Sequence, residues 1–184
     1  MIIVGQIFTT ISYLIYYISR FRKKKKDILI MDNISKFFTV LSFVFLKSYD
    51  GVSATVYTYV RNKVHNMVVG NKKRVIYAFW LLLFALIIML GIKFNGIGTV
   101  CVFITMIANL IGVMFLNSQG MRVCTMCGSI FYVIFQITIQ NYAGAIGESL
   151  TFVVNGVSFS LYFKKGEKIG VYEQGNRSEI KKDM

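Results

Sequence analysis

Apolar residues follow one another along this chain in seven runs of about 20 residues, rather than alternating with polar residues as in soluble amphipathic helices. The runs cover residues 2–19, 28–46, 51–70, 75–92, 97–116, 123–140 and 143–163. At about 1.5 Å per residue, each run is long enough to cross roughly 30 Å of hydrocarbon. Seven such runs leave no amphipathic shell that could bury them in water. The pattern therefore predicts an all-α integral membrane protein with seven transmembrane helices.

Lysine and arginine gather between the apolar runs, and their distribution predicts the orientation of the chain. The net charge is +13, and 16 of the 21 Lys and Arg residues lie in residues 19–27, 71–74, 117–122 and 164–184. The turns on the opposite side hold only Lys47 and Lys93. Because basic loops stay in the cytoplasm, we expect the N-terminus outside and the C-terminus inside. Topology explains this charge, so we expect no nucleic-acid partner.

A repeat with an offset of 93 residues divides the chain. Tyr49-Asp50-Gly51 recurs as Tyr142-Ala143-Gly144, and eleven residues after each glycine stands an asparagine, Asn62 or Asn155. The offset relates the first three runs to the last three. It predicts a 3+1+3 arrangement with three-helix units at residues 1–70 and 96–163, a linking helix at 71–95 and an unstructured cytoplasmic tail at 164–184. Because one helix separates the units, they should run parallel about a pseudo-two-fold axis along the membrane normal.

Asn62 and Asn155 are predicted to lie near the middle of the membrane, where an amide needs hydrogen-bonding partners. Two facing amides could bind a polar solute between the units. Alternatively, each amide could join the helices of its own unit, at roughly 0.6–2 kcal/mol per hydrogen bond. The residue pattern leaves these two interpretations equally open.

Charged residues also lie within the apolar runs, where an unpaired charge costs about 2.5–3.5 kcal/mol or more. Arg61 has no charged counterpart in the second unit, so it could determine which solute charge the site prefers. Asp32 and Lys36 lie one helical turn apart and can pair, and Glu148 or Asp32 could carry a proton. One interpretation is a structural ion-pair cluster. The other is an asymmetric cavity that favours a polar or anionic solute.

The sequence contains no motif typical of a catalytic or metal site. Cys124 and Cys127 have the spacing of redox and zinc sites, but no second pair lies nearby and His65 is the only histidine. We therefore interpret these cysteines as small buried apolar residues. We expect no metal, no cofactor and no enzymatic activity.

The stretch Ser48–Asn62 (SYDGVSATVYTYVRN), together with 141–148 (NYAGAIGE), resembles the bacterial inner-membrane YgjV family. The resemblance covers most of residues 5–163 and implies a multi-pass protein of the bacterial inner membrane. That family is similar to the SWEET and SemiSWEET sugar carriers and the PnuC vitamin transporters, which implies alternating access around a site between two three-helix units. In SWEET-like carriers an asparagine on the third helix of each unit contacts the substrate, and Asn62 and Asn155 match those positions. The Pro-Gln hinge of those carriers is missing, because this chain has no proline.

Two functions from different classes follow. The first is a permease for a small polar or anionic solute, working by facilitated or proton-coupled alternating access, with Asn62 and Asn155 as its central pair. The second is a non-transporting membrane scaffold or accessory subunit that keeps only the repeat architecture, which the missing prolines favour. A polar cavity that reaches both asparagines would favour the permease, and apolar packing between the units would favour the scaffold. The sequence leaves the solute and the oligomeric state open.

Overall fold

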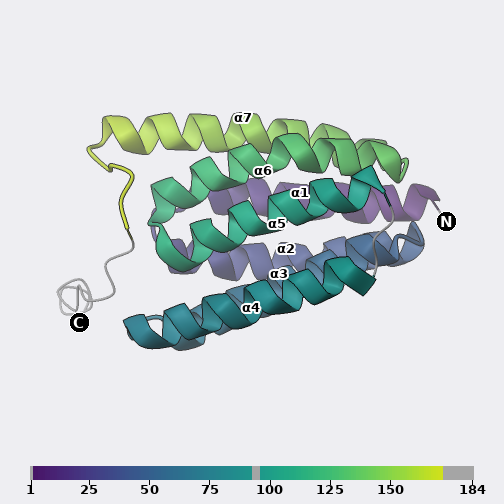
Figure 1. The fold of residues 1–184 in the computed structure, drawn as a ribbon. Coiled ribbons are helices and arrows are strands. Elements are labelled where there is room, and N and C mark those ends of the chain that lie inside the picture. Colours follow the sequence, from purple (N-terminus) through teal and green to yellow (C-terminus); the bar gives the residue numbers. More distant parts are fainter. Residues whose placement is uncertain (1, 93–95, 172–184) are drawn as a thin grey trace.

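The computed structural model describes residues 2–92 and 96–171, and these form seven α-helices (Figure 1). The helices are α1 Ile2–Arg20, α2 Lys25–Phe45, α3 Tyr49–Val68, α4 Lys72–Ile92, α5 Ile97–Phe115, α6 Ser118–Thr138 and α7 Tyr142–Lys164. The predicted all-α architecture of seven helices is confirmed. Their positions follow the apolar runs, because each run supplies enough packing surface for one helix and each polar turn ends it.

The largest difference in helix bounds is at the start of α6, which begins at Ser118 instead of near Val123. The side chain of Asn117 caps this helix by accepting a hydrogen bond from the Gly120 N–H at 3.0 Å. Such a cap satisfies one of the unpaired N–H groups at a helix start. Residues 117–122, which the sequence placed between two apolar runs, therefore form the cap and the first turn of α6.

Six of the helices form a closed ring. Around the ring α1 packs on α2, α2 on α3, α3 on α5, α5 on α6, α6 on α7, and α7 on α1. The remaining helix, α4, lies outside the ring against α3 and α5 (Figure 1). On α4, Leu82 and Leu86 are buried toward these neighbours, whereas Trp80 and Phe84 are exposed. The ring therefore has an interior that α4 does not enter.

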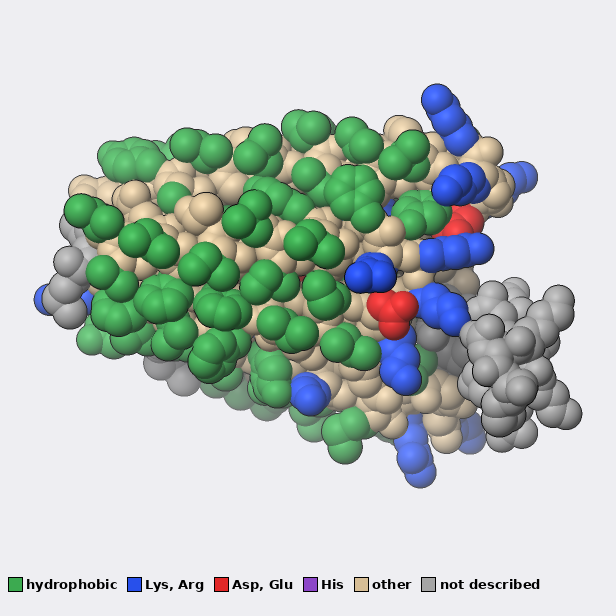
Figure 2. All heavy atoms as spheres, turned by 180° about the vertical axis from the view of Figure 1, so that it is seen from behind, with side chains coloured by type: hydrophobic (Ala, Val, Ile, Leu, Met, Phe, Trp, Pro, Cys, Tyr) green, Lys and Arg blue, Asp and Glu red, His purple; other side chains and the backbone are tan. Residues whose placement is uncertain are grey.

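Apolar side chains cover the outer surface along the length of the bundle, while lysine and arginine gather toward one end (Figure 2). At this end, called the basic end below, α1, α3, α5 and α7 finish and α2, α4 and α6 begin. The exposed large hydrophobic residues include Leu14, Phe37, Trp80, Ile104 and Phe152. An apolar belt of this extent is the surface that a bilayer covers.

Within the described residues, α2, α5 and α6 are long and apolar enough to cross a membrane by length and composition. The composition of α3 is much more polar, because Arg61, Asn62, Lys63 and His65 follow one another closely on it. Arg61, Asn62 and His65 are nevertheless buried. Most of the polar groups of α3 therefore face protein rather than lipid, as the bilayer requires.

Part of the predicted unstructured tail is ordered. Residues 165–171 fold back over the connection between α5 and α6, where the Asn117 N–H donates to the Gly170 carbonyl at 3.0 Å. The buried side chain of Gln119 donates to the Glu167 carbonyl at 3.3 Å. The polar side chains at the start of α6 thus supply donors that hold this segment. Residues 172–184 lie outside the described residues.

Candidate functional site

A polar cavity of about 100 Å³ lies inside the ring of six helices. Its lining comes from α1, α2, α3, α5, α6 and α7, and includes no residue of α4. All but three of its lining residues carry a hydroxyl, an amide or a charge, the exceptions being Phe43, Ala54 and Met106. One water molecule needs about 10–15 Å³ of such a volume. The cavity therefore has room for several waters or a small polar solute.

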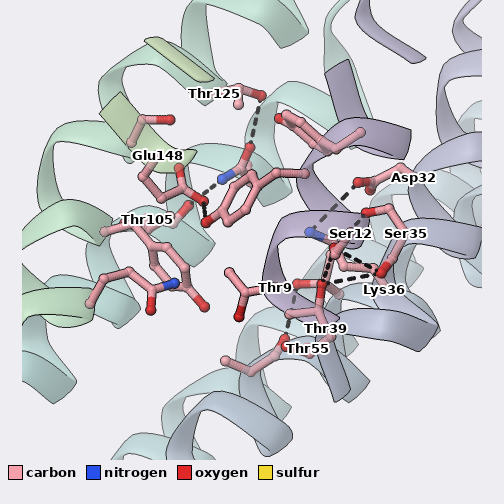
Figure 3. A pocket seen from close by; sticks show the side chains of 18 of the residues that line it. Thr9, Ser12, Asp32, Ser35, Lys36, Thr39, Thr55, Thr105, Thr125 and Glu148 are labelled. Atoms are coloured by element: carbon pink, nitrogen blue, oxygen red, sulfur yellow. Dashed lines mark hydrogen bonds and ion pairs between the residues drawn. The ribbon is translucent and has the colours of Figure 1, made fainter. Parts of the chain in front are cut away.

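Hydroxyl groups on both sides of the cavity hold neighbouring helices together. Ser12 on α1 donates to the Ser35 carbonyl of α2 at 2.9 Å, and its Oγ lies 2.6 Å from Thr39 Oγ1. Thr105 on α5 donates to the Gly128 carbonyl of α6, also at 2.9 Å. Figure 3 shows the labelled residues of α1, α2 and α3 on one side of the cavity and Thr105, Thr125 and Glu148 on the other. The cavity therefore lies between the two halves of the ring.

Asp32 is the centre of the charged groups on one side of the cavity. Its Oδ1 lies 3.6 Å from Lys36 Nζ and 4.0 Å from Arg20 Nη2. The Arg20 guanidinium also stacks on the ring of Tyr16, 4.0 Å from its centroid. Asp32 is only 4% exposed, so these cations, rather than bulk water, compensate its charge. Asp32 and Lys36 thus form the ion pair that their spacing allowed.

Asn62 joins α3 to α2 and does not line the cavity. Its amide nitrogen donates to Asp32 Oδ2 at 2.8 Å and to Asn33 Oδ1 at 3.0 Å. Its Oδ1 accepts from Arg61 Nη2 at 2.9 Å. Arg61 itself does line the cavity. The geometry of Asn62 therefore corresponds to the interpretation in which the amide stabilises its own three helices.

Asn155 is also fully buried but has a different set of partners. Its amide nitrogen donates to the Thr151 carbonyl one turn earlier on α7, at 2.8 Å. Its Oδ1 has no hydrogen-bond partner in the described part of the chain. Asn155 is likewise absent from the cavity lining. The structure thus brings Arg61, Asp32, Lys36 and Glu148 to one cavity and leaves both predicted asparagines behind its wall.

Glu148 lines the cavity from α7, and α1 holds its carboxylate. The Tyr13 hydroxyl donates to Glu148 Oε1 at 2.9 Å, and the Tyr17 hydroxyl donates to the neighbouring Gly147 carbonyl at 2.6 Å. The two carboxylates of the cavity therefore have different surroundings. Asp32 lies next to two cations, whereas a neutral hydroxyl holds Glu148.

Besides Arg20 in the cavity, two further buried cations at the basic end were not predicted as site residues. Lys25 on α2 donates to the Val113 and Leu116 carbonyls at the end of α5, at 2.5 and 2.8 Å. Arg122 on α6 donates to the Arg22 carbonyl just after α1, at 2.9 Å. Each cation satisfies carbonyls that end a helix in the other half of the ring. In the sequence both lie in basic segments between apolar runs, and no local signal distinguishes them from the exposed lysines and arginines beside them.

The three cysteines are free thiols. Cys124 is partly buried and Cys127 is exposed, so the expectation of two buried residues is wrong for Cys127, which points outward from α6. Among the described residues no three His, Cys, Asp or Glu side chains form a group that could hold a metal ion.

A family model described as bacterial inner membrane protein, Imp-YgjV, matches residues 3–165 of the chain. No curated protein and no solved structure matches the chain. The resemblance to the YgjV family that residues 48–62 and 141–148 indicated is therefore confirmed. The likeness to sugar and vitamin carriers stays a prediction.

Proposed function

The chain belongs to this family of bacterial inner membrane proteins, and from that premise we propose that it is a permease for a small polar solute. The polar cavity within the ring is the observation that carries the proposal. A protein that served only as a scaffold would gain little from such an interior, since buried polar groups without partners cost free energy. A passing solute would supply those partners.

The proposed solute site lies on a pseudo-two-fold axis between two three-helix units, as the 93-residue repeat predicts. Eight pairs of cavity-lining residues are related by this offset and support the proposal. The pairs are Ser12 and Thr105, Tyr13 and Met106, Tyr16 and Asn109, Asp32 and Thr125, Lys36 and Ser129, Thr39 and Tyr132, Phe43 and Gln136, and Thr55 and Glu148. Equivalent positions thus contribute to one cavity from both sides.

The turns before α3 and α7 add independent support for the repeat. Ser48 and Asn141 each cap the following helix by accepting a hydrogen bond from an N–H three residues later. The residues before them, Lys47 and Gln140, both have a left-handed backbone, with φ of 56° and 57°. Two non-glycine residues seldom share such a conformation at equivalent positions by accident. The helix order around the ring is also preserved when α1, α2 and α3 exchange places with α5, α6 and α7.

The proposed solute is polar or anionic, because the cations of the cavity outnumber its carboxylates. Arg20, Lys36 and Arg61 line it together with Asp32 and Glu148. The positions equivalent to the three cations are Val113, Ser129 and Val154, which are neutral. The positive charge therefore comes from the first unit alone, and it would attract an anionic group on the solute.

If transport is coupled to protons, Glu148 is the carrier we propose. Asp32 lies beside the cations Lys36 and Arg20, whereas Glu148 accepts a hydrogen bond from the neutral Tyr13 hydroxyl. A carboxyl group in such surroundings can exchange a proton without breaking an ion pair. The proposal includes no cofactor and no enzymatic step.

Uptake into proteoliposomes tests the permease, with a panel of labelled small sugars, amino acids and organic acids. The Ser129 hydroxyl lines the cavity without a hydrogen-bond partner in the described structure. Ser129→Leu would fill this space, so we expect uptake at least about ten-fold below wild type. Ser149→Leu, on the exposed face of α7, is the matched control and should transport normally. Unchanged uptake by folded Ser129→Leu would exclude the cavity as the pathway.

A membrane scaffold or accessory subunit is the second candidate function. It is favoured by the burial of Asn62 and Asn155 behind the cavity wall and by the absence of proline. The same uptake panel separates the two functions. Folded protein that takes up none of the solutes and co-purifies with a membrane partner in a fixed ratio would support the scaffold.

A further inference from the structure

We propose that the crevice between α2 and α3 on the outer surface binds one anionic phospholipid. The crevice has a volume of about 550 Å³. It is lined by Ile30, Asn33, Ile34, Lys36, Phe37 and Val40 of α2 and by Val56, Tyr59, Lys63 and Asn66 of α3. Ile34, Phe37, Val56 and Tyr59 are each more than 40% exposed, so the crevice faces lipid. This binding site is independent of whether the protein transports a solute.

The polar side chains of the crevice that lie toward the basic end form a phosphate site there. Lys63 is exposed, and its ammonium lies 5.7 Å from the centroid of the Tyr59 ring. Asn33 accepts a hydrogen bond from Asn62 through its Oδ1, which leaves its amide NH2 group as the donor that a ligand can use. Asn66 adds a second amide. Ammonium and amide donors together are the chemistry that recognises a phosphate group.

The depth of these groups fits a lipid of the basic-end leaflet. Lys63 lies five residues, or about 8 Å, from the end of α3 at Val68, which is close to headgroup depth. The lining covers residues 30–40 of α2 and 56–66 of α3, about 15 Å along each helix. This is half of the roughly 30 Å hydrocarbon thickness. Phe37, Val40 and Val56 lie at the deeper end, where they would contact an acyl chain.

The equivalent place between α6 and α7 has none of these donors. The counterparts of Asn33, Lys63 and Asn66 at the 93-residue offset are Met126, Gly156 and Phe159. There the Met126 side chain lies beside Gly156, with its Cε at an ordinary van der Waals distance of 3.6 Å from the position that a Cβ on Gly156 would take. The cation and the two amides of the crevice therefore occur together on one half only, which indicates a built site rather than a general property of the surface.

Lys36 lies between the crevice and the central cavity, because it lines both. Its ammonium pairs with Asp32 at 3.6 Å. A lipid in the crevice would thus fill the space between α2 and α3 directly beside the charged groups of the cavity.

Native mass spectrometry of the purified full chain, titrated with phosphatidylglycerol or phosphatidylcholine, tests the headgroup. We expect tighter binding of phosphatidylglycerol. Lys63→Gln should weaken it about five-fold, the effect of ~1 kcal/mol for one basic residue near a membrane surface, and should leave phosphatidylcholine unchanged. Lys73→Gln removes an exposed charge at the start of α4, outside the crevice, and should change neither. Equal phosphatidylglycerol binding by the two variants would overturn the proposal.

A second pair of variants tests the acyl-chain part. Val56→Trp would fill the deep end of the crevice and should abolish the retained phosphatidylglycerol adduct. Val44→Trp is the control, since Val44 is exposed on α2 but does not line the crevice. Circular dichroism establishes that each variant is folded. If folded Val56→Trp keeps the adduct as Val44→Trp does, the lipid lies elsewhere on the surface and the crevice is not its site.

Discussion

Asn62 and Asn155 are 93 residues apart in the sequence, at the offset of the predicted repeat, yet their neighbours give them different contacts. Asn62 has Arg61 beside it and Asp32 and Asn33 opposite, and it bonds to all three. Asn155 has Val154 beside it and bonds within α7. The amide of Asn62 therefore joins α3 to α2, whereas the amide nitrogen of Asn155 donates within one turn of α7.

This difference predicts unequal costs of removing the two amides. Asn62→Ala leaves buried charged groups without a hydrogen-bond partner, so we expect a loss of about 2–3 kcal/mol in the free energy of unfolding. Asn155→Ala removes a single intrahelical bond and should cost less than about 1 kcal/mol. Thermal unfolding of both variants in one detergent, followed by circular dichroism, measures the difference. A loss below about 1 kcal/mol for Asn62→Ala would show that the network around Asp32 does not stabilise the fold.

At the scale of elements, the contact between α1 and α7 depends on a close approach at Gly147. A Cβ there would collide with the ring of Tyr13, which holds Glu148, while Tyr17 donates to the Gly147 carbonyl. Small residues permit such approaches between membrane helices. Gly147 thus sets the distance between α1 and α7 on this side of the cavity.

Gly147→Ala should therefore destabilise the protein, by about 1–3 kcal/mol for an overpacked contact. Gly156→Ala on the same helix is the matched control, because its Cβ would meet only the flexible end of Met126 at 3.6 Å. Because alanine has a better helix propensity than glycine, Gly156→Ala should leave the free energy of unfolding unchanged or raise it by up to about 1 kcal/mol. The melting temperatures of the two variants measure this difference. A Gly147→Ala protein as stable as Gly156→Ala would contradict the close contact between Gly147 and Tyr13.

At the scale of the whole molecule, Lys25 and Arg122 join the halves of the ring in a reciprocal way. Lys25 at the start of α2 binds carbonyls at the end of α5, and Arg122 near the start of α6 binds a carbonyl after α1. Both cations are buried at the basic end. The ring is therefore fastened at this end by charge-assisted hydrogen bonds as well as by packing.

The concentration of charge at the basic end predicts that this end faces the cytoplasm. Green fluorescent protein fluoresces only when it folds in the cytoplasm, so a fusion to the C-terminus should be fluorescent. A fusion after residue 140, at the opposite end of the bundle, should be dark. The reverse pattern would show that the chain is inserted with its N-terminus inside.

By itself, the sequence determined the seven helices, their order and the family. The lengths of the apolar runs and the residues of the turns between them are local properties, so they can be recognised without any tertiary contact. The sequence also singled out Asp32, Lys36, Arg61 and Glu148, because charges within apolar runs need an explanation.

Only the tertiary structure decided which polar groups meet. It placed Asn62 and Asn155 behind the cavity wall, and it turned Arg122 from a loop charge into a buried cap for α1. Arg122 and Arg22 are separated by 100 residues along the chain. Pairings over such separations depend on how the helices pack, which a pattern of single positions does not encode. The cavity itself arises in the same way, from small and polar side chains that six helices bring together.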